Sequence, residues 1–147
     1  MIKVLWLCKT DKFVIALQPY LKGFDISIVI CHKPDESLEQ YAASQADLVV
    51  MDANWGYNLS GITILKNFLN FNHAIKVIFV TAFFQAALID KIKDAGAKGY
   101  FYRNVDNNIQ QIVNCITDVY NNKTFFIAAP LKSPINEKNL FQDDNTF

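Results

Sequence analysis

Three polar residues, Asp52, Thr81 and Arg103, each stand directly after a short and almost wholly apolar run. Such runs are typical of strands that are buried on both faces of a parallel sheet. The carboxyl ends of parallel strands meet at one edge, where open α/β sheets bind their ligands. We therefore expect a carboxylate, a hydroxyl and a guanidinium to converge on a small pocket suited to an anion.

The elements that would hold these residues alternate regularly along the chain. Apolar runs of strand length alternate with segments whose apolar residues recur at helical spacing, which predicts an α/β fold with a doubly wound parallel sheet and three layers, α/β/α. The expected strands are 2–8, 25–31, 46–52, 76–80 and 99–102, and the expected helices are 11–22, about ten residues from 34, a segment after Ser60, 83–95 and 109–120.

Two details of the helices are specific enough to test. Gly96 is expected to stop the fourth helix, because glycine adopts the left-handed conformation that ends helices. The first helix is expected to bury one stripe of residues, namely Phe13, Ala16, Leu17, Tyr20 and Leu21.

The chain is expected to form one domain over residues 1–127, with a linker or disordered tail over 128–147. The final segment is polar, contains proline and lacks periodicity. Just before it, Phe125, Phe126 and Ile127 are expected to fold back on the core.

Composition limits the classes of function. Hydrophobic residues make up 52% of the chain and charged residues 19%, which favours a compact globular protein. Fourteen basic and fourteen acidic residues cancel, which argues against strong nucleic-acid binding by this part of the protein. No apolar stretch approaches the length of a membrane span, so we expect a cytoplasmic protein without a membrane partner.

The cysteines indicate a reducing environment. Cys8, Cys31 and Cys115 are three in number and sit in apolar segments, so buried reduced thiols are expected. A redox or soft-metal site that combines Cys8, Cys31 and His32 is the weaker alternative, since no C-x-x-C spacing supports it.

Three segments resemble the receiver domains of two-component response regulators: DLVVMD, VIFVTA and DAGAKGYFYR. The resemblance covers residues 1 to about 127 and implies a flavodoxin-like, five-stranded sheet in the order 2-1-3-4-5. It implies that Asp52 is at the phospho-acceptor position and that Thr81 and Tyr100 are switch residues. Arg103 stands where the family has an invariant lysine.

Within this family, the chain is most similar to the subgroup that carries a LuxR-type helix-turn-helix. The similarity rests on the segment GYFYRN, the amphipathic last helix and the segment NNKTFF. This resemblance implies transcription regulation, with DNA bound by an output domain that is absent from this chain. A histidine kinase or another regulatory protein is the implied partner. We also expect a weak homodimer, because uncharged polar residues occupy the outward face of the last helix: Asn107, Gln110, Gln111 and Asn114.

One departure from the family lies in the pocket itself. Cys8 and Lys9 stand at the positions of the acidic pair that binds Mg²⁺ in the family. A thiol is a poor ligand for Mg²⁺ and an ammonium group repels it. Asp11 is an alternative ligand, although its position favours capping of a helix. No cofactor is therefore expected, and weak Mg²⁺ binding would rely on Asp52 and the backbone of Asn54.

Several alternatives stay open at this point. Lys9 is either a counter-ion for Asp52 or a solvated lysine, and Tyr100 is either a switch or an edge-strand aromatic. Trp55 and Tyr57 either contact a partner or cover the sheet edge. The chain is either an atypical receiver that accepts phosphate or a pseudo-receiver that acts by protein contacts alone. An enzyme is not expected, because the glycine-rich loops and nucleophile motifs of α/β enzymes are missing.

Overall fold

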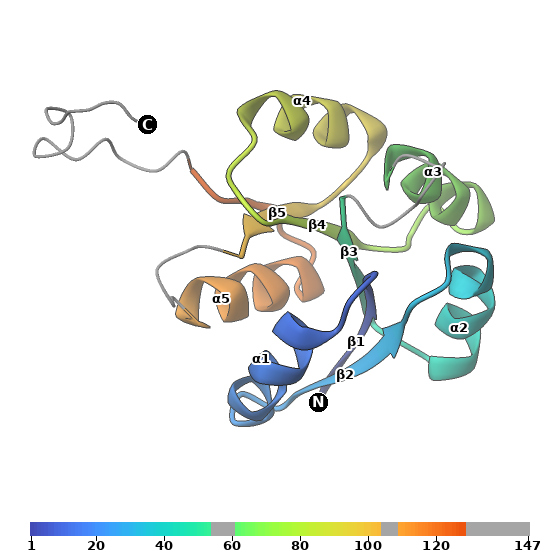
Figure 1. The fold of residues 1–147 in the computed structure, drawn as a ribbon. Coiled ribbons are helices and arrows are strands. Elements are labelled where there is room, and N and C mark those ends of the chain that lie inside the picture. The colour runs from blue at the N-terminus through green and yellow to red at the C-terminus, as the bar shows by residue number, and fades with distance from the viewer. Residues whose placement is uncertain (54–60, 104–108, 129–147) are drawn as a thin grey trace, which may run out of the picture.

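The computed structural model describes residues 1–53, 61–103 and 109–128, which form strands and helices in alternation (Figure 1). A 3-10 turn, Pro34–Glu36, leads into the second helix. The strands are β1 Ile2–Leu7, β2 Ile26–Cys31, β3 Leu48–Asp52, β4 Val77–Thr81, β5 Gly99–Tyr102 and β6 Phe125–Phe126. The helices are α1 Lys12–Lys22, α2 Ser37–Ser44, α3 Gly61–Phe71, α4 Ala86–Ala95 and α5 Ile109–Tyr120.

The strands form one parallel sheet in the order β2-β1-β3-β4-β5-β6. The predicted order of the first five strands is confirmed. A sixth strand was not predicted: the segment expected to fold back on the core pairs with β5, with Phe125 N donating to Lys98 O and Ile127 N donating to Tyr100 O. Two residues were too few to show strand periodicity in the sequence.

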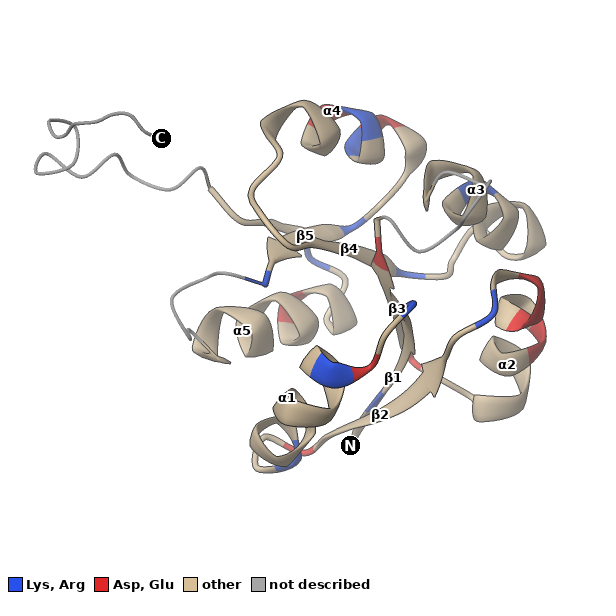
Figure 2. Cartoon of the chain, viewed as in Figure 1, with Lys and Arg blue, Asp and Glu red and all other residues tan. Residues whose placement is uncertain are grey.

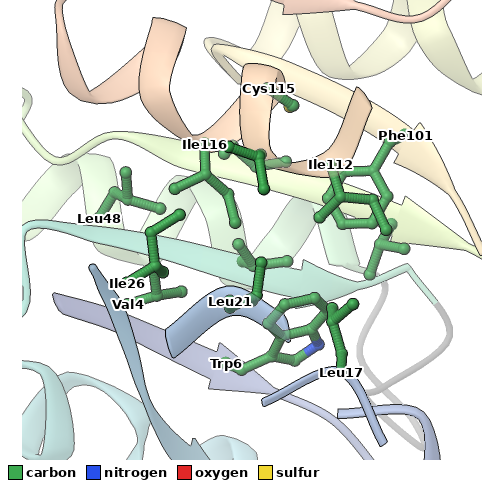
Figure 3. Packing of buried hydrophobic residues seen from close by; sticks show 14 of the residues in the cluster. Val4, Trp6, Leu17, Leu21, Ile26, Leu48, Phe101, Ile112, Cys115 and Ile116 are labelled. Atoms are coloured by element: carbon green, nitrogen blue, oxygen red, sulfur yellow. The ribbon is translucent and has the colours of Figure 1, made fainter. Parts of the chain in front are cut away.

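The core has two parts, one on each face of the sheet. Helices α2, α3 and α4 pack on one face, and α1 and α5 pack on the other (Figure 1). On the second face, Trp6 of β1 lies among Leu17 and Leu21 of α1 and Ile112 and Ile116 of α5 (Figure 3). Each such side chain contributes about 1.5–3 kcal/mol when fully buried. The central strands are therefore covered on both sides.

The buried stripe of α1 differs from the expected one. Val14, Leu17 and Leu21 face the core, whereas Ala16 is exposed and Tyr20 is 62% exposed. Leu17 follows Val14 by three residues and Leu21 follows Leu17 by four, so the three side chains lie on one line of the helix, and this line faces the sheet. The expectation placed the apolar face one residue too far around the helix, because alanine and tyrosine are apolar enough to suggest burial and tolerate exposure equally well.

Other sequence expectations concern details of the chain. The three cysteines are free and buried, as predicted. Of the helices in the described ranges, none is long and apolar enough to span a membrane. The predicted linker, residues 128–147, lies outside the described residues except for Ala128, and Ser60 also lies outside them.

Gly96 ends α4 in the left-handed conformation, with φ of 104°, and its N–H donates to Lys93 O. A Cβ at this position would lie 2.7 Å from Leu69 Cδ1 of α3. We expect Gly96→Ala to lower the free energy of unfolding by about 1–3 kcal/mol, because it adds backbone strain to this close approach. Urea unfolding followed by circular dichroism measures the effect.

Gly23→Ala is the matched control for this prediction. Gly23 follows α1 with φ of −63°, and an added Cβ would meet only Tyr20 O, at 3.3 Å. Its expected effect is within about 0.5 kcal/mol. Equal losses in the two variants would contradict the assignment of strain to Gly96.

Candidate functional site

A cavity of about 190 Å³ lies at the carboxyl ends of the central strands. Asp52 is the last residue of β3, Thr81 is the last residue of β4, and Arg103 follows β5. Arg103 N donates to Thr81 O at 2.7 Å, which extends the pairing of β4 and β5 to this edge. The structure thus brings the three residues together in one cavity, whose lining is Lys9, Thr10, Asp52, Ala53, Val80, Thr81, Ala82 and Arg103.

The Asp52 carboxylate is partly buried, and burial raises its pKa above the ordinary value. The positive charge of Arg103 acts in the opposite direction and only partly offsets burial. No ion pair between described residues includes Asp52. Arg103 therefore acts on this carboxylate through its charge within the shared cavity, and the role of Lys9 as a counter-ion for Asp52 stays a prediction.

Phe13 of α1 accounts for the position of the Arg103 guanidinium. The guanidinium carbon lies 5.9 Å from the centre of the Phe13 ring, a cation–π arrangement. Arg103 thereby connects the end of β5 with α1 at the carboxyl edge of the sheet. This contact has no sequence signal, because it depends on how α1 is turned on the sheet.

The two residues at the acidic-pair positions have different surroundings. Cys8 is 0% exposed and belongs to the core cluster under α1 and α5, whereas Lys9 is exposed and lines the cavity. Burial, with smaller contributions from the charges of Asp52 and Asp11, raises the pKa of the Cys8 thiol to about 12. Cys8 is thus a neutral core residue, and Lys9 is the one of the two that faces the cavity.

Asp11 occupies the N-cap position of α1, as expected, but its side chain makes no capping hydrogen bond. Its carboxylate lies 3.6 Å from His32 Nε2 instead. His32 Nδ1 lies 3.0 Å from Cys8 O, and it must donate in this contact because a carbonyl oxygen only accepts. Sequence reasoning did not identify His32 as a support for the loop that carries Lys9, since the contact depends on the pairing of β1 with β2.

The cysteines do not form the alternative redox or metal site. Cys8 and Cys31 belong to core clusters on opposite faces of the sheet, so their sulfur atoms point away from each other. Within the described ranges, no three His, Cys, Asp or Glu side chains are grouped so that they could hold a metal ion.

The described lining does not fit Mg²⁺. Asp52 is its single carboxylate, and Lys9 and Arg103 add two cationic groups. Mg²⁺ prefers several hard oxygen ligands in octahedral geometry. Asn54, whose backbone was the remaining expected ligand, lies outside the described residues, as do Trp55, Tyr57 and Asn107.

Tyr100 and Thr81 form a buried hydrogen-bond network beside the cavity. Their hydroxyl oxygens are 2.7 Å apart, and Thr81 donates to Phe83 O at 2.6 Å. The Tyr100 hydroxyl also accepts from Gln85 N at 3.0 Å. Tyr100 is 0% exposed, and β6 lies outside β5, so Tyr100 is an interior residue and not an edge-strand aromatic. The network fixes the segment between β4 and α4.

We expect Tyr100→Phe to lower the free energy of unfolding by about 1–2 kcal/mol, because Thr81 and the Gln85 N–H lose a buried partner. Amide exchange at Gln85 should accelerate as well. Tyr102→Phe is the control, since Tyr102 is only partly buried and contacts Phe84 through its ring. An unchanged exchange rate at Gln85 in Tyr100→Phe would contradict the role given to this network.

Asp52→Asn tests the electrostatics of the cavity. Because burial raises the pKa of Asp52 in the folded state, that state binds the proton more tightly than the unfolded chain does. The contribution of Asp52 to wild-type stability should therefore fall as pH rises from its unfolded pKa through its folded one. The stability gain of Asp52→Asn should grow over this range and then level off.

Urea unfolding between acid and neutral pH measures this difference. Asp90→Asn, which removes a charge from an exposed position of α4, serves as control. A gain for Asp52→Asn that shrinks with rising pH would contradict the prediction.

Comparisons with known proteins identify the family and the fold. A family model described as "Response regulator receiver domain" matches residues 10–116. No curated protein sequence matches the chain significantly.

Solved structures match the fold at low sequence identity. A LuxR-family two-component response regulator from Aurantimonas sp. SI85-9A1 is 16% identical, with a TM-score of 0.74 and coverage of 94% of each chain. The isolated REC domain of RcsB from Salmonella enterica serovar Typhimurium, solved with the phosphomimetic BeF3-, is 12% identical, with a TM-score of 0.74 and coverage of 86% of this chain and 93% of that one. The receiver domain of the Francisella response regulator 1452 is 20% identical, with a TM-score of 0.70 and coverage of 83% and 98%.

Proposed function

The chain belongs to the response regulator receiver domain family of two-component signalling, and we propose that it is an atypical receiver controlled by protein contacts instead of magnesium-dependent phosphorylation. The observation that carries this proposal is the composition of the cavity. One carboxylate, Asp52, faces two cationic side chains, Lys9 and Arg103. A divalent cation gains too few oxygen ligands there and is repelled by both cations.

In this proposal Lys9 and Arg103 supply the positive charge that a metal ion would otherwise bring. Their charge is part of the fold and does not depend on a signal. The cavity then keeps one electrostatic state, and the output follows the abundance of the protein or the binding of a regulatory partner. A histidine kinase remains a candidate partner, which in this proposal would bind the receiver without transferring a phosphoryl group to Asp52. No catalytic activity and no cofactor are part of the proposal.

The proposal includes a role in transcription regulation. The LuxR-like phrases around Arg103 and after α5, and the structural similarity to a LuxR-family regulator, support this subgroup. DNA would be bound by a separate output domain. In the described part of this chain, Lys and Arg lie on several elements, as do Asp and Glu (Figure 2). A cytoplasmic location fits this role.

Weak self-association is a further part of the proposal. Gln110 and Asn114 are exposed on α5 and hydrogen-bond to each other at 2.8 Å. Uncharged polar side chains of this kind are buried at lower cost than charged ones, which favours α5 as a contact surface.

A second candidate function is that of a receiver that accepts phosphate without a metal ion. Its support is the shared cavity of Asp52, Thr81 and Arg103. An Asp52 carboxylate oxygen would attack the phosphorus of the donor, and the bond from phosphorus to the donor would break, with its electron pair leaving on the donor. Arg103 is able to bind phosphoryl oxygens in a bidentate manner.

Acetyl phosphate separates the two candidates, with modification of Asp52 measured by intact mass and peptide mapping. The wild type is incubated with Mg²⁺ or with a chelator, beside Lys9→Asp and Lys9→Gln. Lys9→Asp adds a carboxylate at the cavity, whereas Lys9→Gln removes only the charge. We expect the wild type to stay unmodified and a magnesium-dependent product to form in Lys9→Asp, because carboxylate oxygens are what Mg²⁺ lacks here.

The double variant Cys8→Asp/Lys9→Asp is the fuller restoration of the acidic pair, although it places a carboxylate at a buried position. Magnesium-dependent modification of the wild type would overturn the proposal. Equal modification with Mg²⁺ and with the chelator would instead establish the second candidate.

A further inference from the structure

The two edges of the sheet differ in how they are protected. β6, at one edge, has two residues, whereas β2, at the other, has six residues, ISIVIC, without a charge or a proline. Proteins usually protect an edge strand by making it short or by placing charges, proline or a bulge on it. β2 pairs with β1 in unbroken register over its full length and shows none of these devices.

The outward backbone groups of β2 belong to its even-numbered residues. Asp25 O accepts from Ile2 N, and Cys31 O accepts from Cys8 N, so the odd-numbered residues direct their backbone groups to β1. The alternation of a parallel strand then turns the N–H and C=O groups of Ile26, Ile28 and Ile30 away from the sheet. These groups form a ladder ready for another strand.

We propose that β2 pairs with β2 of a second copy of this chain, antiparallel and about a two-fold axis at Val29. In this register Ile28 lies opposite Ile30 of the second copy and Ile26 lies opposite its His32. These are hydrogen-bonded pairs of outward backbone groups, as an antiparallel ladder requires. The result is one continuous sheet through both copies. The inference does not depend on the proposed function.

Charge complementarity selects this partner and this register. β2 begins after Asp25, a turn residue with φ of 62°, and ends before His32 and Lys33, so an antiparallel copy brings the Asp25 side chain near Lys33 at both ends of the paired strands. The two side chains are 71% and 70% exposed, and each has a surface partner in its own chain: Asp25 Oδ2 lies 3.4 Å from the N-terminal amine, and Lys33 Nζ lies 3.8 Å from Glu36 Oε2. Exposed pairs of this kind contribute little, so both charges can contact a second copy. Moving the axis by one residue sets Asp25 opposite the apolar Cys31, or sets Ile26 opposite Pro34, which has no N–H to donate.

An apolar groove beside β2 adds to the same surface. Its volume is about 780 Å³, and Ile15 and Pro19 of α1 and Ile28 of β2 contribute to its lining. Ile15 is 52% exposed although it lies next to the sheet. The two-fold axis would bring α1 of both copies to the same face of the joined sheet. Burial of these side chains would then accompany the strand pairing.

Charge reversal tests the register without altering the core. Asp25→Lys and Lys33→Asp each turn both attractive end pairs into repulsive ones, and both positions are exposed. We expect each variant alone to self-associate about tenfold more weakly than the wild type. Their equimolar mixture should recover wild-type affinity, since the lysine introduced in one variant would then face the aspartate introduced in the other. Sedimentation equilibrium of the full chain at low salt measures this, and circular dichroism checks folding.

A backbone variant and a surface control complete the test. Ile28→Pro removes one outward N–H and leaves the pairing with β1 intact, so it should weaken the dimer of a folded protein. Asp90→Lys with Lys91→Asp exchanges two exposed charges of α4, away from β2 and α5, and should leave β2 pairing unaffected. A wild type that stays monomeric, or a dimer that responds to the α4 changes or is insensitive to charge reversal at β2, would overturn the inference.

Discussion

Burial of the central strands between two helical layers is the constraint on which the rest of the structure depends. The first four residues of β3 are completely buried, and Asp52, the next residue, is only partly buried. A carboxylate is costly to bury, so β3 can extend no further into the core than this residue. At the other end, Asp47 accepts a hydrogen bond from Lys3 N at 2.8 Å, which holds β3 in register with β1.

The residues that line the cavity are determined by where the buried strands end. Polar residues that terminate parallel strands must meet at the same edge, and here they bring Asp52 and Thr81 beside the following Arg103. The β1 strand ends differently. Its chain continues into the core as far as Cys8, so the thiol joins the apolar packing and the next residue, Lys9, turns to the cavity. The resemblance implies two acidic residues at the positions of Cys8 and Lys9. In this chain one of them is a buried thiol and the other an ammonium group, so this side of the cavity carries a positive charge in place of a negative one.

The sequence was sufficient for features that depend on the periodicity of single segments and on strand ends. The order of the strands followed from the family resemblance, and the convergence of Asp52, Thr81 and Arg103 followed from their positions after apolar runs. Contacts between segments were beyond this reasoning. The pairing of Asp11 with His32 needs the register of β1 against β2, and the cation–π contact of Arg103 with Phe13 needs the rotation of α1. Both quantities are set by packing, which leaves no local pattern in the sequence.

The edge strand and the cavity are connected through one side chain. His32 directly follows β2, and it donates to the carbonyl oxygen of Cys8 and lies beside the Asp11 carboxylate. The loop between β1 and α1 is therefore held from the side of β2, and the same loop presents Lys9 to the cavity. A strand added at this edge would engage the backbone of His32 next to that contact. The contacts of His32 with Cys8 and Asp11 thus connect the end of the edge strand β2 with the loop that positions the Lys9 charge near Asp52.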